Sequence, residues 1–289
     1  MVSRTPWLVL AVSVAVEVAG CKGSGGESGP AETPPAPEPP RASERMAAEL
    51  DKQCTNDDFE ACRNLSVMLM EGLGIPREPV RARALLDKAC AGGNGAACNN
   101  LGLVYAAGVG VPPDLARGAS LYARSCDGGD GLGCRNLGIM VLEGRGVKRD
   151  VARARELFDK ACELGAPFGC RSLGQMYAEA PEGQRDDGKA VDLFVRACNG
   201  DDAVACRFLG EMYGLGRGVP KGFAPAATWF QKACDGGDGP GCRNLAVLYG
   251  GGLGVDRDEV KGRELMARAC ELGDETACGV PETGGDAGP

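Results

Sequence analysis

The spacing of the cysteines constrains the fold of this chain more than any other feature. After Cys21, all cysteines form pairs with seven residues between the partners, and the pairs recur every 36 residues without insertion or deletion. The seven pairs are Cys54 and Cys62, Cys90 and Cys98, Cys126 and Cys134, Cys162 and Cys170, Cys198 and Cys206, Cys234 and Cys242, and Cys270 and Cys278. A repeat of about 20 to 50 residues indicates a solenoid, in which each unit buries its apolar face against its neighbours. We therefore expect one elongated repeat domain.

Each period predicts a helical hairpin. In the first helix, Cys98, Leu101 and Tyr105 lie three or four residues apart and share one face. Gly108 and Gly110 end that helix, because glycine readily adopts the left-handed conformation of a helix terminus. The leucine recurs in every hairpin as Leu65, Leu101, Leu137, Leu173, Leu209 and Leu245.

The second helix of each hairpin follows an acidic residue such as Asp114, which suits the exposed amides of a helix start. Its buried face is expected to carry Leu121 and Tyr122. The equivalent pairs are Leu157 and Phe158, Leu193 and Phe194, and Trp229 and Phe230. Cations near the end of this helix suit its macrodipole. They are Lys88, Arg124, Lys160, Arg196, Lys232 and Arg268.

Six hairpins and one extra helix are expected over residues 43–278. The extra helix precedes Cys54 and occupies the place of a second helix, with Met46 and Leu50 on its apolar face. The loop of the fourth hairpin, residues 178–185, lacks the usual Gly-x-Gly-Val sequence and contains Pro181, so we expect a different turn there. Residues 279–289 form a Gly-rich tail.

Residues 1–20 resemble a secretory signal peptide. Arg4 is followed by a short apolar run, too short to span a membrane as a helix. The sequence Val18-Ala19-Gly20-Cys21 resembles the lipobox of bacterial lipoproteins, which implies that Cys21 is the mature amino terminus and the lipid anchor. An ordinary cleaved signal with Cys21 as a spare thiol is the alternative. Residues 21–42 are rich in Pro and Gly and predict an extended tether. From the signal peptide and the lipobox together, we expect a lipoprotein of the bacterial envelope that faces the periplasm or the cell surface.

The composition argues against nucleic-acid and metal partners. The formal net charge is -8, whereas phosphate binding needs clustered positive charge. The chain has no histidine, the commonest metal ligand and the most frequent general base near neutral pH. We expect no cofactor, no metal and no nucleic acid.

Three chemistries compete for the cysteine pairs. Zinc sites use spacings of about two to four residues and commonly histidine, and redox-active pairs usually have the C-x-x-C spacing. Structural disulfides agree with an even number of cysteines in an exported protein. Bridges within a hairpin, such as Cys62 to Cys90, would leave Cys54 and Cys278 unpaired, whereas bridges across seven residues use all fourteen cysteines. We expect the latter, each worth about 2.6 kcal/mol by loop entropy.

The repeat unit resembles the Sel1-like repeat, a subclass of tetratricopeptide-like hairpins. The residues that carry the resemblance are Leu101-Gly102, Tyr105, Gly108-x-Gly110-Val111, Asp114 and Arg124-Ser125-Cys126. With the cysteine pairs added, the unit is similar to the Helicobacter-type cysteine-rich protein family over about residues 54–278. The resemblance implies an all-α, right-handed α-solenoid of disulfide-clamped hairpins that is used as a scaffold for protein or peptide contacts.

Two other functions compete with a scaffold. Some members of the cysteine-rich family carry a penicillin-binding or β-lactamase label. This chain has no S-x-x-K motif, which a conventional serine β-lactamase needs. We assign no catalytic residue, and turnover of nitrocefin would distinguish such an enzyme from a scaffold. The third function is a structural spacer without a specific ligand.

The residues that follow the second cysteine of each pair are the candidate binding residues. The first position holds Arg63, Asn99, Arg135, Arg171, Arg207 and Arg243, and the next holds Asn64, Asn100, Asn136, Ser172, Phe208 and Asn244. Such a ladder could hold an extended acidic peptide, because arginine binds carboxylates and asparagine pairs with peptide groups. Alternatively, the arginines pair with neighbouring acidic residues and the asparagines satisfy local backbone groups. The Asp pairs 57–58, 186–187 and 201–202 are assigned to helix caps and loops rather than to acid-base catalysis.

Overall fold

The computed structural model describes residues 41–181 and 183–279. The predicted signal peptide, Cys21, most of the tether and nearly all of the tail lie outside these residues. Contacts divide the chain into residues 1–39 and 40–289, and the repeat body lies within the second unit. Its described residues form α-helices and turns, with no strand. None of the described helices combines the length and apolar character needed to cross a bilayer.

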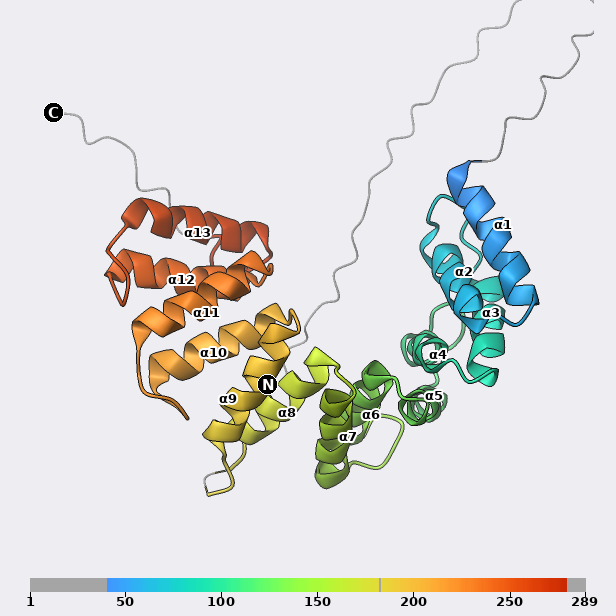
Figure 1. Ribbon diagram of the computed structural model, residues 1–289, viewed down its shortest axis with the longest axis horizontal. Helices are drawn as coiled ribbons and strands as arrows, with labels where there is room; N and C mark the ends of the chain where they lie inside the picture. Colours follow the sequence, from blue (N-terminus) through green and yellow to red (C-terminus); the bar gives the residue numbers. More distant parts are fainter. Residues whose placement is uncertain (1–40, 182, 280–289) are drawn as a thin grey trace, which may run out of the picture. The chain divides into compact units, whose positions relative to one another are not determined.

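The repeat body is a succession of helical hairpins (Figure 1). The helices are α1 (Ala42–Thr55), α2 (Phe59–Glu71), α3 (Pro79–Ala91), α4 (Gly95–Ala107), α5 (Leu115–Asp127), α6 (Gly131–Glu143), α7 (Val151–Glu163), α8 (Pro167–Ala178), α9 (Asp187–Asn199), α10 (Ala203–Leu215), α11 (Phe223–Asp235), α12 (Gly239–Gly251) and α13 (Glu259–Glu271). The hairpins run from α2–α3 to α12–α13, and α1 packs on α2 as the extra helix. The predicted all-α solenoid is confirmed.

The first helices of successive hairpins approach one another. Each helix packs against its neighbours along the chain, and α4 also contacts α2 and α6. Direct contacts likewise join α6 to α8 and α10 to α12. The even-numbered helices therefore share one side of the array, which we call the first-helix face.

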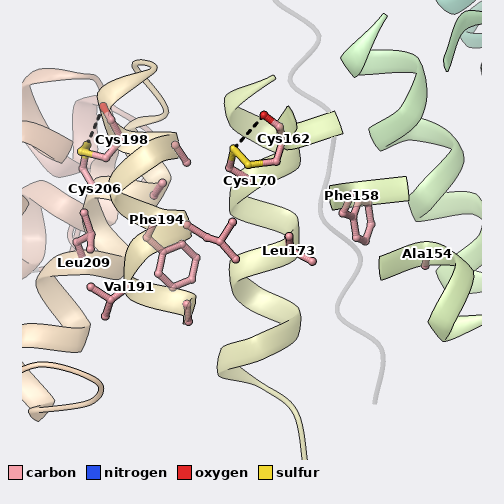
Figure 2. Packing of buried hydrophobic residues seen from close by; sticks show 14 of the residues in the cluster. Ala154, Phe158, Cys162, Cys170, Leu173, Val191, Phe194, Cys198, Cys206 and Leu209 are labelled. Atoms are coloured by element: carbon pink, nitrogen blue, oxygen red, sulfur yellow. Dashed lines mark hydrogen bonds between the residues drawn. A yellow bond between two sulfur atoms is a disulfide. The ribbon is translucent and has the colours of Figure 1, made fainter. Parts of the chain in front are cut away.

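The hydrophobic core continues from one hairpin to the next. All six predicted leucines are at most 4% exposed. Figure 2 shows Leu173 of α8 between Phe158 of α7 and Phe194 of α9, and all three belong to one buried cluster. Because neighbouring hairpins contribute to the same cluster, each hairpin depends on the next to exclude water from its apolar residues.

Glycine on the first helix makes room for an aromatic ring on the second. A methyl group added at Gly138 would lie 2.6 Å from Cε1 of Phe158. Four hairpins share this pair, as Gly102 and Tyr122, Gly138 and Phe158, Gly174 and Phe194, and Gly210 and Phe230. The other two hairpins have Ser66 with Leu86 and Ala246 with Met266. The glycine is therefore present only where the second helix supplies a ring.

The turns between the helices of a hairpin follow the predicted glycines. Gly108 and Gly110 have φ values of 74° and 68°, in the left-handed region. The fourth hairpin differs. Its first helix, α8, ends one residue earlier than the equivalent helices, and the residue that caps it, Glu179, has a φ of −103°, outside the left-handed region. The expected change of turn is observed there.

Each cysteine pair forms a disulfide between partners eight positions apart, with Cα atoms 4.4–4.8 Å from each other. Cys90 lies in the last turn of α3 and Cys98 in the first turn of α4, so the bridge joins one hairpin to the next. This is the pairing that we expected from the sequence.

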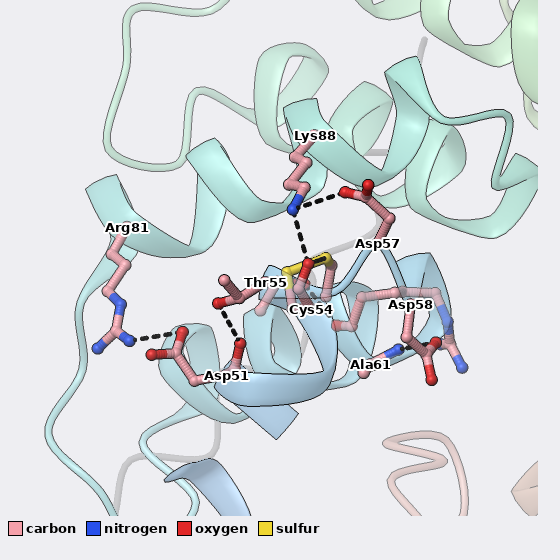
Figure 3. The surroundings of a disulfide bond; sticks show 11 residues. Asp51, Cys54, Thr55, Asp57, Asp58, Ala61, Arg81 and Lys88 are labelled. Atoms are coloured by element: carbon pink, nitrogen blue, oxygen red, sulfur yellow. Dashed lines mark hydrogen bonds and ion pairs between the residues drawn. A yellow bond between two sulfur atoms is a disulfide. The ribbon is translucent and has the colours of Figure 1, made fainter. Parts of the chain in front are cut away.

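The cations of the second helices reach back to the preceding bridge. Figure 3 shows Lys88 of α3, whose Nζ donates to the Cys54 carbonyl at 2.6 Å and lies 3.0 Å from Oδ1 of Asp57. Equivalent hydrogen bonds join Arg124 to Cys90 at 3.0 Å, Arg196 to Cys162 at 3.2 Å and Arg268 to Cys234 at 3.3 Å. We attributed these cations to the macrodipole of their own helix. These four lie in the last turn of their own helix, as predicted, and also cap carbonyl groups at the end of the preceding odd-numbered helix.

Candidate binding surface

Two columns of side chains run along the first-helix face. The first column contains Asn64, Asn100, Asn136, Ser172, Phe208 and Asn244. The second lies one turn further along each helix and contains Val67, Leu103, Ile139, Gln175, Glu211 and Val247. All twelve residues are half-buried or exposed, and Leu103 and Val247 are 43% and 55% exposed. The face therefore presents amide groups beside aliphatic side chains.

The face is hollowed between hairpins. A groove of about 420 Å³ separates α2 from α4, and its lining includes Val67, Met70, Asn100 and Leu103. A smaller groove of about 120 Å³ lies between α8 and α10. A third hollow, about 750 Å³, is lined mainly by a loop and by residues of the second helices. It is more open and polar, so we regard the grooves of the first-helix face as better suited to aliphatic side chains.

Three arginines of the predicted ladder are held by aspartates 31 residues further along the chain. Nε of Arg171 donates to Oδ2 of Asp202 at 2.6 Å, and the Asp202 side chain is 1% exposed. The same contact joins Arg207 to Asp238 at 2.8 Å and Arg243 to Asp274 at 2.6 Å. The charges of these three arginines are therefore paired within the protein.

The first arginine of the ladder also has an internal partner. Nε of Arg63 donates to both carboxylate oxygens of Glu60 at 3.1 Å. The hydrogen bond from Arg63, followed by one from Asn94, lowers the pKa of Glu60. At the other end of the ladder, burial raises the pKa of Asp238, although Arg207 acts in the opposite direction.

The asparagines of the ladder divide into buried and accessible groups. Asn99 is 5% exposed, and its Oδ1 accepts a hydrogen bond of 2.8 Å from Nδ2 of Asn136. Asn99 therefore supports its neighbour instead of facing a ligand. Asn64, Asn100 and Asn244 are half-buried, so their amide groups remain candidates for contact with a peptide.

Arg135 differs from the other arginines of the ladder. Within the described residues, no carboxylate lies within 4.0 Å of its guanidinium, and Nε is buried without a hydrogen-bond partner. Nη1 donates to Oδ1 of the neutral Asn136 at 3.3 Å. Burial, followed by the charge of Arg171, lowers the pKa of Arg135.

The sequence contains the signal for these ion pairs, but the ladder alone does not reveal it. Each aspartate partner follows its arginine by 31 residues. Asp202 and Asp238 also cap the next first helix, as Asp202 does by accepting from the Ala205 amide at 3.2 Å. Aligning the hairpins gives this column as Asp58, Asn94, Asp130, Ala166, Asp202, Asp238 and Asp274. Arg135 is the arginine whose counterpart is alanine.

The aspartate pairs 57–58, 186–187 and 201–202 lie in turns and at the starts of helices. Asp58, Asp186 and Asp202 each accept a hydrogen bond from a backbone amide at the start of a helix. Asp57 and Asp201 have φ values of 65° and 66° at positions where most hairpins have glycine. Over residues 41–181 and 183–279, no group of three His, Cys, Asp or Glu side chains is arranged to hold a metal ion.

The model of the Sel1 repeat family matches six segments of the chain. They are residues 59–94, 95–130, 131–165, 167–202, 203–238 and 239–274. The boundaries of these segments place one first helix and one second helix in each match. No curated protein matches the chain.

Solved structures of Sel1 repeat proteins are similar to this chain. One is c5321, a protective antigen of uropathogenic Escherichia coli, with 31% identity and a TM-score of 0.70 over 80% of this chain and 50% of that one. This chain thus spans half the length of that relative. A Sel1 repeat protein of Oxalobacter formigenes has 22% identity and a TM-score of 0.69 over 78% of this chain and 92% of that one. Helicobacter pylori cysteine rich protein B has 36% identity and a TM-score of 0.39 over 47% of this chain and 97% of that one.

Proposed function

Because this chain belongs to the Sel1 repeat family, we propose that it is a non-catalytic scaffold that binds an extended segment of a protein partner. Sel1 repeats form helical scaffolds that typically mediate protein interactions. The observation that carries the proposal is the pair of columns on the first-helix face. The two positions recur once per hairpin, and four of the six hairpins place an asparagine beside an aliphatic residue there. An extended peptide likewise presents its own backbone and side-chain groups at regular intervals.

The grooves support this geometry. The groove between α2 and α4 places the apolar Val67 and Leu103 beside the amide of Asn100. An aliphatic side chain of the partner would lose contact with water there, while Asn100 pairs with a nearby peptide group. The disulfides hold neighbouring hairpins together, so little of the binding free energy is spent on ordering the surface.

Site-specific photocrosslinking tests the scaffold proposal. A photoreactive phenylalanine analogue replaces Leu103 on the first-helix face, and a matched control replaces Val260, which is 58% exposed on the second helix α13. Illumination of cells that express the full chain, followed by mass spectrometry, is expected to give the same protein adduct repeatedly from position 103 and not from position 260.

Absence of a reproducible adduct from position 103 would support the structural-spacer alternative instead. Equal capture at positions 103 and 260 would show that the first-helix face has no special role. A second photoreactive position at Val247, 55% exposed on α12, checks whether the partner extends along the array.

We further propose that Cys21 carries a lipid that anchors the scaffold to a membrane of the bacterial envelope. The lipobox-like residues 18–21 support this proposal, and so do seven disulfides in the repeat body, which persist in oxidising compartments. Cys21→Ala is expected to move the protein from the membrane fraction to the soluble fraction, as measured by immunoblotting after cell fractionation. Membrane retention of the variant would contradict lipidation at this residue.

A further inference from the structure

Arg135 lacks a counter-charge that the equivalent arginines have. In the next three hairpins, the arginine at this position pairs with the aspartate 31 residues further along the chain, as Arg171 does with Asp202 at 2.6 Å. Asp202 and Asp238 also cap the first helix that follows. The residue that would pair with Arg135 is Ala166, which has no side-chain oxygen. The cap of α8 accordingly lacks a side-chain hydrogen bond as well.

Arg135 has no carboxylate in direct contact among the described residues, and the charge of Asp202, which acts on it from further away, is already paired with Arg171. Its side chain is half-buried, and its Nε is shielded from solvent. Its guanidinium donates a hydrogen bond to the neutral side chain of Asn136. A cation removed from water without an opposite charge destabilises the folded protein. An incoming carboxylate would therefore gain both the charge interaction and a well-ordered donor.

An exposed aromatic ring adjoins this cation. Phe168 of α8 is 42% exposed, and its ring centroid lies 5.9 Å from Cζ of Arg135 and 5.7 Å from Cζ of Arg171. The ring provides apolar surface for the stem of an acidic side chain and limits the access of water. Limited water access strengthens an ion pair because it lowers the effective dielectric constant.

We propose that Arg135 anchors a carboxylate of the bound partner segment, supplied by an Asp or Glu side chain that lies over α6 and α8. This proposal rests on the proposed scaffold function. The carboxylate contacts the Nη groups of Arg135, because Nε is covered by the protein. It takes the role that Asp202 has toward Arg171, with Phe168 beside the methylene groups of the ligand.

A blocked acidic residue provides a direct probe. The ¹⁵N-labelled, oxidised full chain is titrated with N-acetyl-aspartate N-methylamide while the Nε–H signal of Arg135 is followed by NMR. Comparison with the spectrum of Arg135→Lys identifies this signal. The uncharged isostere N-acetyl-asparagine N-methylamide is the control ligand, and sodium acetate separates a peptide site from a site for small anions.

A saturable shift is expected with the aspartate probe, with at least about tenfold weaker binding of the asparagine probe, as for loss of one charge-assisted hydrogen bond. Ala166→Asp supplies the missing carboxylate internally and is expected to weaken binding of the aspartate probe by a similar factor. Its melting temperature should equal or exceed that of the wild type, which excludes unfolding as the cause.

Equal binding of the aspartate and asparagine probes, or unchanged binding by Ala166→Asp, would overturn the carboxylate anchor. Binding of acetate as tight as that of the aspartate probe would reduce the site to one for small anions and would also overturn it. The photocrosslinking result is independent. If position 103 captures a partner equally well in Ala166→Asp, the scaffold function stands without this anchor.

Discussion

At the scale of single residues, two of the aspartates that cap first helices, Asp202 and Asp238, also pair with an arginine. Asp202 accepts one hydrogen bond from the Ala205 amide and another from Nε of Arg171. Its side chain is almost completely buried. Removal of its carboxylate would leave a helix amide and a half-buried cation without partners. A buried charge that loses its partner costs more than a lost cap alone.

We expect Asp202→Ala to lower the free energy of unfolding by about 3–5 kcal/mol, as is typical when one partner of a buried ion pair is removed. The measurement is equilibrium urea unfolding of the oxidised protein, monitored by circular dichroism. The matched control is Asp58→Ala, because Asp58 caps the Ala61 amide at 3.0 Å, as Asp202 caps that of Ala205, and forms no ion pair with an arginine among the described residues. The control should cost about 1 kcal/mol, and equal losses in both variants would contradict a contribution from the ion pair.

At the scale of the helical hairpin, packing depends on complementary residues in its two helices. Phe158 fills the space above Gly138, whereas hairpins with an aliphatic residue at the ring position have Ser66 or Ala246 in place of the glycine. Glycine lowers helix propensity, so its presence in four first helices reflects close contact with the ring. The glycine and the aromatic residue therefore form one packing unit.

We expect Gly138→Ala to destabilise the protein by about 1–3 kcal/mol, because the overpacking of a ring outweighs the gain in helix propensity. The measurement is the change in urea midpoint at a constant m-value. In the background Phe158→Leu, the same substitution should be neutral or stabilising by up to about 1 kcal/mol. Destabilisation of equal size in both backgrounds would show that the ring is not the cause.

The sequence predicts these hairpins well because every determinant is local or repeated. The helix that carries Leu101 ends at Gly108, as the glycine predicts, and the six hairpins follow the cysteine period. The candidate site was less predictable, because Arg171 and Asp202 meet across a hairpin boundary and 31 residues of chain. The burial of Asn99 also depends on neighbouring helices, so inspection of the ladder alone overestimated the number of accessible groups.

At the scale of the whole repeat body, the disulfides are not equally accessible. The cysteines of the first six bridges are all at most 4% exposed. In the last bridge, Cys278 is exposed and Cys270 is half-buried. Thiol–disulfide exchange requires direct approach of a thiolate to sulfur, so burial protects a bridge from reduction.

We expect mild reduction of the folded protein to open Cys270–Cys278 before the other bridges, because its two cysteines are the most exposed of the fourteen in the repeat body. Alkylation at successive times, followed by peptide mass spectrometry, measures the order. The other six bridges should react only after partial unfolding, and urea should remove most of the difference. Simultaneous reduction of all seven bridges under native conditions would contradict protection by burial.

Ala166 occupies a position that holds aspartate in most of the repeats. This difference affects how a bound segment aligns along the repeating surface. An array of identical hairpins would accept the same extended chain after a shift of one unit, so the bound segment could adopt several registers. Among the arginines of the ladder, which all lie in the described part of the chain, Arg135 is the one without a carboxylate partner, and this makes its hairpin different from the others. An acidic side chain in the partner would then select one alignment, and the irregular unit would determine where the partner begins and ends on the array.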